Sequence, residues 1–203
     1  MVTSNLIGGL GNYLFQIATS YSLAIDNGDS IVYDPENSVI VHNHINTYRN
    51  NVLNNVPFGC VLVENEYQEP DFRYSPIEYK PNLKINGYYQ SEEYFKHNRE
   101  SILELFSFGD DSNKLVNEKY SDILNSKTCA IHVRRGNYLT LPNHHPVCLF
   151  DYYQRAIELM PKDCTFVVFS DDLAWCKNNF NSIDREFCYV EGNVDYVDLL
   201  LMS

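Results

Sequence analysis

The stretch CAIHVRRGNY, residues 129–138, organises this chain. Its first half, Cys129 to Val133, is short, mostly apolar and preceded by polar residues, which predicts a buried β-strand. The strand runs into two adjacent arginines, and a strand of an α/β sheet that ends in this way presents positive charge where such sheets bind ligands. Arginine suits phosphate because its planar guanidinium donates two parallel, charge-assisted hydrogen bonds. Gly136 permits a close approach of the backbone.

Arg134 and Arg135 have a second interpretation, in which both are structural and pair with carboxylates. The chain is acidic, with 15 Lys and Arg against 27 Asp and Glu and a formal net charge of −12. Such a chain repels nucleic acid and anionic membrane surfaces, so we expect no nucleic-acid partner. A negatively charged ligand would need a local basic site, and the arginine pair supplies one.

Length and composition bound the class of protein. The chain has 203 residues, of which 44% are hydrophobic and 21% charged, which fits one sizeable globular core or two small domains. No stretch approaches the ~20 apolar residues of a membrane helix, and no signal peptide is visible at the start. The six cysteines are widely spread without a C-x-x-C pair, which favours reduced thiols in a cytoplasmic protein over a zinc site or a secreted, disulfide-bonded one. His42 and His44 would share a strand face, but no ligand cluster completes a metal site.

A glycine-rich turn lies near the start of the chain. The segment NLIGGLGN, residues 5–12, predicts a short strand, a turn, and a helix from Asn12, its N-cap, to Asn27. Backbone N–H groups and a helix N-terminus at the edge of a sheet suit an anion or a sugar, although a tight structural turn is the alternative. Leu14 stands where a dinucleotide fingerprint has its third glycine, so that motif is not present.

The remaining pattern alternates strands and helices, as in an α/β fold. Strands are predicted at residues 30–33, 60–64, 83–89, 165–170 and 187–190. Helices are predicted at residues 46–57, 92–106, 113–124, 150–160, 173–180 and 194–202, and a domain boundary near Ser126.

A pair of aspartates, Asp171 and Asp172, follows the strongly apolar strand 165–170. Carboxylates at this place could bind a metal or act as acid and base, or they could cap the next helix and neutralise an arginine. We favour capping and pairing, with Arg134 or Arg135 as the partner.

Four motifs in order resemble one family. His132-x-Arg134-Arg135-x-Asn137 resembles the His-x-Arg-Arg-x-Asp signature of α1,2- and α1,6-fucosyltransferases. The segments GGLGNYLFQIA (8–18), GYYQSEEYF (87–95) and DLLLMS (198–203) resemble the α1,2 enzymes. The chain is identified as a member of the α1,2-fucosyltransferase family, glycosyltransferase family 11, of the soluble bacterial or viral type.

This resemblance implies a GT-B-like α/β fold with two Rossmann-like parallel sheets. Residues 1–125 would form the acceptor-side domain, and residues 126–203 an incomplete GDP-fucose domain. The implied reaction is inverting transfer of L-fucose from GDP-fucose to the 2-hydroxyl of a galactoside, within a glycan acceptor, without a metal or other cofactor.

The resemblance also implies roles for individual residues. Arg134 would stabilise the leaving diphosphate, Arg135 would orient the loop, and His132 would position the nucleotide. Asp171 is a candidate catalytic residue and Asp172 a candidate donor-binding residue. The glycine turn would face the cleft and contribute to donor binding through Gly8, Gly9, Gly11 and Asn12.

Two departures from the family pattern affect these expectations. Asn137 stands where the family has aspartate, which removes a charge beside the arginine pair. The chain also stops before a further strand and an Asn-Ser-Ser-Phe-Ser-Trp-Trp segment, so we expect a C-terminally truncated member. Both departures favour the alternative of a non-catalytic protein, descended from such an enzyme, that binds a nucleotide or carbohydrate.

Overall fold

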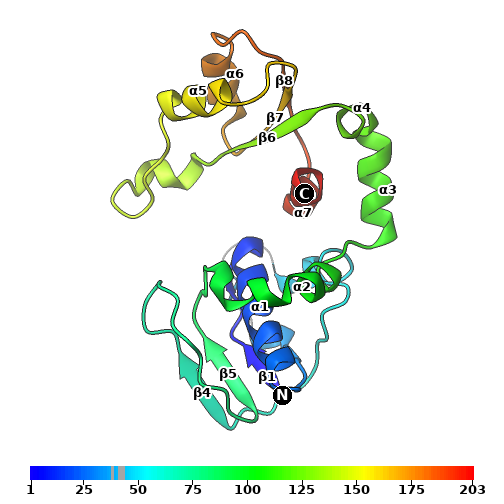
Figure 1. Ribbon diagram of the computed structural model, residues 1–203, viewed down its shortest axis with the longest axis vertical. Helices are drawn as coiled ribbons and strands as arrows, with labels where there is room; N and C mark the ends of the chain where they lie inside the picture. Colours follow the sequence, from blue (N-terminus) through cyan, green and yellow to red (C-terminus); the bar gives the residue numbers. More distant parts are fainter. Residues whose placement is uncertain (38, 41–43) are drawn as a thin grey trace. The chain divides into compact units, whose positions relative to one another are not determined.

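A computed structural model describes residues 1–37, 39–40 and 44–203, so the strand position expected of His42 lies outside the described residues. The contacts divide the chain into Met1–Asp110 (unit 1) and Asp111–Ser203 (unit 2), each of which Figure 1 shows. The expected boundary at residue 126 falls within unit 2, and the assignment of functional domains stays a prediction. Among the described residues, no helix combines the length and the apolar character needed to cross a bilayer.

Unit 1 is built on a parallel three-stranded sheet in the order β1-β5-β4. Its strands are β1 (Val2–Ser4), β5 (Leu83–Asn86) and β4 (Asn65–Gln68). A second parallel pair joins β2 (Ile7–Gly8) to β3 (Val39–Ile40). Leu83 and Ile85 of β5 are buried in the core with Tyr89 and Tyr94.

Helix α1 (Leu10–Asp26) ends at Asn27 as predicted, but it begins before Asn12. Its N-cap is Gly9, without a side-chain hydrogen bond, so the prediction of Asn12 as the cap is wrong. The glycine turn itself starts the helix, and the Asn12 side chain instead accepts a hydrogen bond from Gln90 Nε2 at 2.8 Å.

The predicted helix at 46–57 is wrong. The structure has only a 3-10 helix, Ile45–Thr47, followed by turns. Asparagine side chains in this segment donate hydrogen bonds to backbone carbonyls. Asn51 Nδ2 donates to Thr47 O at 3.1 Å, and Asn55 Nδ2 donates to Glu104 O at 3.1 Å. Such bonds offer the backbone an alternative to the helix.

Three strand predictions in unit 1 are also wrong in extent. The strand predicted at residues 83–89 ends at Asn86, because Gly87 and Tyr89 have positive φ angles of +156° and +53°. Residues 60–64 form no strand, since the apolar side chain of Leu62 is 57% exposed and the nearby strand β4 begins only at Asn65. Residues 30–33 form two isolated bridges, at Ile31 and Tyr33. The helix expected from residue 92 starts as 3-10 helices, Glu92–Tyr94 and Lys96–Asn98, and becomes α2 at Arg99–Leu105.

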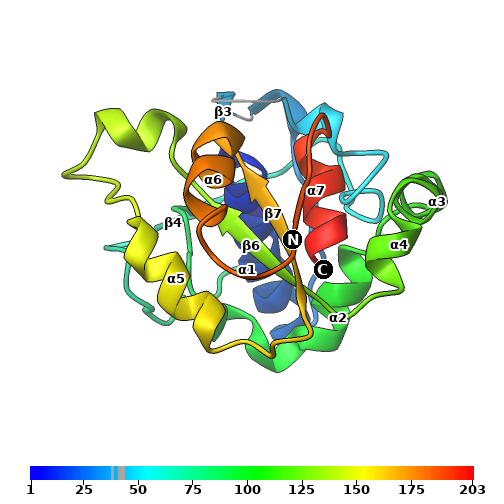
Figure 2. The ribbon, with the colours of Figure 1, turned by 90° about the horizontal axis from the view of Figure 1, so that it is seen from above.

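Unit 2 alternates helices with a second parallel sheet, in the order β6-β7-β8. Its core lies on both faces of that sheet. α5 and α6 cover one face around Val168 and Phe180, and α4 and α7 cover the other around Phe169 (Figure 1, Figure 2). The elements are α3 (Asp110–Lys119), α4 (Ser121–Leu124), β6 (Thr128–Val133), α5 (Phe150–Glu158), β7 (Thr165–Ser170), α6 (Leu173–Phe180), β8 (Phe187–Tyr189) and α7 (Asp195–Met202).

Strand β6 was expected to be buried, and this expectation is wrong for most of its length. Val133 is buried, whereas Ala130 and His132 are exposed. The exposed residues Thr128, Ala130 and His132 share one face of the strand and alternate with half-buried Cys129 and Ile131. The core on that face gathers around Val167 and Phe169 of β7, whereas Ile131 and Val133 pack into the core on the other face.

Candidate active site

The arginine pair lies at the carboxyl end of β6, next to the carboxyl end of β7. Val133 and Ser170 are partners in the parallel register, and Ser170 Oγ donates to Val133 O at 2.7 Å. Both strands therefore end together, and the residues that follow them emerge side by side. This arrangement brings Arg134 and Arg135 to Asp171 and Asp172.

Two ion pairs join these four residues. Arg134 Nη1 lies 2.7 Å from Asp171 Oδ2, and Arg135 Nε lies 3.0 Å from Asp172 Oδ2. The backbone N–H of Arg135 also donates to Asp171 Oδ1 at 2.8 Å. The expectation of pairing is confirmed, and the formal charges of the four side chains balance.

Asp172 also caps α6, as expected. Its Oδ1 accepts a hydrogen bond from the Trp175 backbone N–H at 3.1 Å. This bond, together with the bond from Arg135, lowers the pKa of Asp172 below its ordinary value.

The two arginines differ in accessibility. The Arg135 side chain is 13% exposed, and its guanidinium lies 4.2 Å from the centroid of the Trp175 ring. The Arg134 side chain is 39% exposed and lies 5.1 Å from the centroid of Tyr138. Arg135 is therefore fixed from two sides, while Arg134 keeps part of its surface open to a ligand.

Residues 136 and 137 hold the turn in place. An added Cβ at Gly136 would lie 2.3 Å from Asp171 Oδ2. The close approach of the backbone that was expected at Gly136 is therefore an approach to the Asp171 carboxylate. Asn137 Oδ1 accepts a hydrogen bond from Arg134 Nη2 at 2.8 Å. The amide thus retains the acceptor that an aspartate would offer, without its charge.

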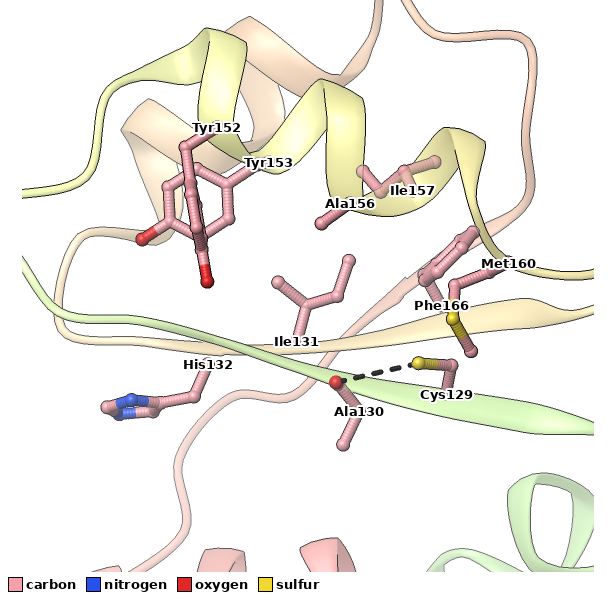
Figure 3. Close-up of a pocket in the computed structure, with 10 residues that line it drawn as sticks. All are labelled: Cys129, Ala130, Ile131, His132, Tyr152, Tyr153, Ala156, Ile157, Met160 and Phe166. Carbon is pink, nitrogen blue, oxygen red and sulfur yellow. Dashed lines mark hydrogen bonds between the residues drawn. The ribbon is translucent and has the colours of Figure 1, made fainter.

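His132 is the last residue but one of β6, two positions before Arg134. It lines a cavity of about 210 Å³ between β6 and α5, whose other walls include Ile131, Tyr153 and Ile157 (Figure 3). The figure shows the imidazole directed away from these side chains. Neither Arg134 nor Arg135 lines this cavity, so it is distinct from the arginine turn.

The glycine turn in unit 1 is shaped by one position above the others. Gly8 has φ +96°, in the region that favours glycine, and an added Cβ there would lie 2.1 Å from Asn12 Nδ2. Gly9 caps α1. A Cβ added at Gly11 would have no atom within 4 Å, so this position has room for a side chain.

Two residues that the sequence reasoning did not single out hold the segment after β5. Gln16 ties this segment to the glycine turn, and Glu69 ties it to the end of β4. Gln16 is fully buried. Its Oε1 accepts from Ile7 N at 3.0 Å, and its Nε2 donates to Ile7 O at 3.2 Å and Gly87 O at 3.1 Å. Glu69 accepts from the backbone N–H groups of Tyr88 at 2.6 Å and Tyr89 at 3.0 Å. The only signal for Gln16 was its place inside the 8–18 motif.

Solved structures share this fold. Fucosyltransferase NodZ from Bradyrhizobium superposes with a TM-score of 0.57 at 16% identity, over 99% of this chain and 82% of that one. NodZ α-1,6-fucosyltransferase soaked with GDP-fucose gives a TM-score of 0.58 at 15% identity, over 98% and 80%. These similarities confirm the expected α/β fold of the GT-B type, with its parallel sheets.

Sequence relatives come from bacteria and mammals. The O-antigen biosynthesis glycosyltransferase WbnK of Escherichia coli is 30% identical over 98% of this chain and 83% of its own length. An alpha-1,2-colitosyltransferase of Escherichia coli is 26% identical over 100% and 81%. Galactoside 2-alpha-L-fucosyltransferase SEC1 of Bos taurus is 29% identical over 92% and 54%. The sequence model of glycosyl transferase family 11 matches residues 1–203, and the chain therefore belongs to this family.

Proposed function

We propose that this chain transfers L-fucose from GDP-fucose to the 2-hydroxyl of a galactoside, with inversion and without a metal. The names of the relatives support the linkage, because they include a galactoside 2-alpha-L-fucosyltransferase and an alpha-1,2-colitosyltransferase. The donor is supported by the similar NodZ structure that was soaked with GDP-fucose. GDP-fucose and a galactoside-containing glycan are thus the proposed partners.

The observation that carries this proposal is the partly open Arg134 at the carboxyl end of β6. In this reaction the bond between fucose C1 and the diphosphate breaks, and negative charge develops on the leaving phosphate. A guanidinium held in advance by Asn137 and Asp171 stabilises that charge without reorganising. The acceptor hydroxyl attacks C1 from the opposite side and loses its proton.

The other residues of the turn support Arg134. Arg135 orients the turn, because its side chain is fixed between Asp172 and Trp175. Asp171 is a positioning residue and a poor general base, since one oxygen faces Arg134 and the other accepts the Arg135 N–H. His132 and the turn formed by Gly8, Gly9, Gly11 and Asn12 remain the proposed contacts to the donor.

The second candidate is a protein that binds the nucleotide or sugar and transfers nothing. Asn137 favours this candidate, since it lacks the charge of the family aspartate. Its retained hydrogen bond to Arg134 favours an enzyme. The Asn137→Asp variant separates the two candidates: transfer that appears only in this variant identifies a disabled enzyme.

The test is a transfer assay with GDP-fucose and lactose, with and without a metal chelator. We expect release of GDP and, by NMR, an α-linked fucose on the 2-hydroxyl of galactose, at a rate that the chelator leaves unchanged. A different linkage would overturn the regiochemistry. Loss of transfer in the chelator would overturn the metal-free mechanism. If the folded protein binds GDP-fucose but forms no product, the second candidate, a protein that binds without transfer, would be correct.

A further inference from the structure

Two aromatic rings stand together at the carboxyl edge of the unit 1 sheet. Phe72 follows β4 and Tyr88 follows β5, and these strands are parallel neighbours. The ring centroids lie 6.1 Å apart with an interplanar angle of 29°, so the rings are stacked. Phe72 is nevertheless 74% exposed, which leaves most of its surface in contact with solvent.

The segments that carry these rings are fixed by hydrogen bonds. Asp71 Oδ1 accepts from the Arg73 N–H at 2.7 Å, and the hydroxyl of buried Tyr94 accepts from Ser75 N at 3.1 Å. On the other segment, the Glu69 carboxylate accepts from Tyr88 N at 2.6 Å. The exposed position of Phe72 is therefore built into the structure, because the segment around it is held on both sides.

The segment that carries Tyr88 is tied to the glycine turn. Gly87, next to Tyr88, accepts a hydrogen bond from Gln16, which also bonds Ile7 at the start of the turn. Gln90 Nε2 donates to Asn12 Oδ1 at 2.8 Å, so both neighbours of the Tyr88–Tyr89 segment are tied to the turn. Hydrogen bonds therefore connect the segment of the Tyr88 ring with the glycine turn.

We propose that Phe72 and Tyr88 form a platform for the acceptor sugar, which rests on the proposed function of the preceding section. A β-galactoside carries C–H groups of C3, C4 and C5 on one face, and an aromatic ring binds such a face through its negative π surface. Asp71, Arg73 and Gln90 stand next to or within two residues of the aromatic residues in the sequence, and all three are exposed. They would supply hydrogen bonds to the sugar hydroxyls, and apolar side chains with a few polar groups are the usual composition of a small-molecule site.

The test compares Phe72→Ala with the matched control Leu62→Ala. Leu62 is also an exposed apolar residue of unit 1, at 57%, but it precedes β4 and so lies toward the opposite end of the strand. We expect Phe72→Ala to raise the KM for a β-galactoside about three- to ten-fold, the range of one aromatic contact. The KM for GDP-fucose and the melting temperature should not change, and Phe72→Trp should restore the acceptor KM. The Leu62→Ala variant should behave as the wild type.

An unchanged acceptor KM in Phe72→Ala, or an equal rise in the KM for GDP-fucose, would overturn the platform. A separate measurement distinguishes this failure from failure of the proposed function. Saturation-transfer NMR with methyl β-galactoside detects binding without turnover. A signal that weakens in Phe72→Ala supports the platform even if no transfer occurs, and an equal signal in both proteins overturns it.

Discussion

The carboxyl edges of the two parallel sheets share a topology and differ in chemistry. In unit 1 the edge is held by the buried amide of Gln16 and by the Glu69 carboxylate, both of which bond backbone groups. In unit 2 the edge is held by two arginine–aspartate pairs. Among the residues that the structure describes, the unit 1 edge thus carries no paired arginine and presents aromatic rings, which suits the proposed sugar, whereas the partly open guanidinium of unit 2 suits the proposed diphosphate. The same parallel-strand topology therefore supports two different kinds of edge.

The largest effect is expected from the glycine of the charged edge. Gly136→Ala places a Cβ 2.3 Å from Asp171 Oδ2, which must move away and release Arg134. We expect transfer to fall about 100-fold, since misplacement by about 1 Å has effects of this size. The control is Gly59→Ala in unit 1, where the nearest atom to an added Cβ is Val32 Cγ1, at an ordinary contact distance of 3.6 Å. If both variants transferred fucose at the wild-type rate, the close contact between Gly136 and Asp171 would not be needed to position Arg134.

The unit 1 edge should depend on Gln16 for stability. Gln16→Ala leaves the backbone groups of Ile7 and Gly87 without their partner, and we expect a loss of about 1–3 kcal/mol in the free energy of unfolding of unit 1. Chemical denaturation measures this loss. Gln68→Ala, at an exposed glutamine of the same unit, is the control and should change little. A Gln16 variant as stable as this control would show that the amide does not hold the edge.

The charged edge should distinguish arginine from lysine at position 135. Arg135→Lys keeps the charge but loses the planar group that lies over Trp175, and we expect a loss of about 0.5–2 kcal/mol in the stability of unit 2. Arg155→Lys, at an exposed position of α5, should be neutral when measured in the same thermal melts. If the Arg135→Lys variant were as stable as the wild type, positive charge alone would be enough to hold the turn.

The smallest effect concerns pH and is expected at Asp172 of the charged edge. The pKa of Asp172 is lowered by the Trp175 N–H and by Arg135, so the folded state favours its ionised form. This contribution is fully present above the unfolded pKa of about 3.9 and is lost as pH falls through the lower folded value. We expect wild-type stability to fall more steeply than that of Asp172→Asn below about pH 4.5. If the stability of the two proteins fell in parallel with pH, the ionised Asp172 carboxylate would not stabilise the fold as described.

The sequence predicted unit 2 better than unit 1, for physical reasons. The strand at residues 165–170 and the helix at 173–180 were predicted with the bounds that the structure shows, since each has a strong local pattern. The pairing of Arg134 and Arg135 with Asp171 and Asp172 was foreseen because both pairs follow strands of an α/β pattern. In unit 1 the asparagine-rich segment has helical spacing, but its side chains bond the backbone.

Other features depend on tertiary contacts that local pattern does not encode. One face of β6 is exposed because the core on that side gathers around β7, which the apolar composition of β6 does not reveal. Gln16 carries no local sign that its amide is buried, because polar residues in a helix are usually exposed. The stacking of Phe72 on Tyr88 joins segments from two strands, and no local pattern predicts it.

The most direct test of the account is calorimetric titration of the protein with GDP and with GDP-fucose, in the wild type and in Arg134→Ala. Arg99→Ala, at an exposed arginine of unit 1, is the control for loss of a positive charge. We expect the wild type and the control to bind both ligands, and Arg134→Ala to bind at least about ten-fold more weakly, the loss of one charge-assisted hydrogen bond. Equal binding by Arg134→Ala, or no binding by the folded wild type, would contradict the claim that the arginine turn holds the diphosphate.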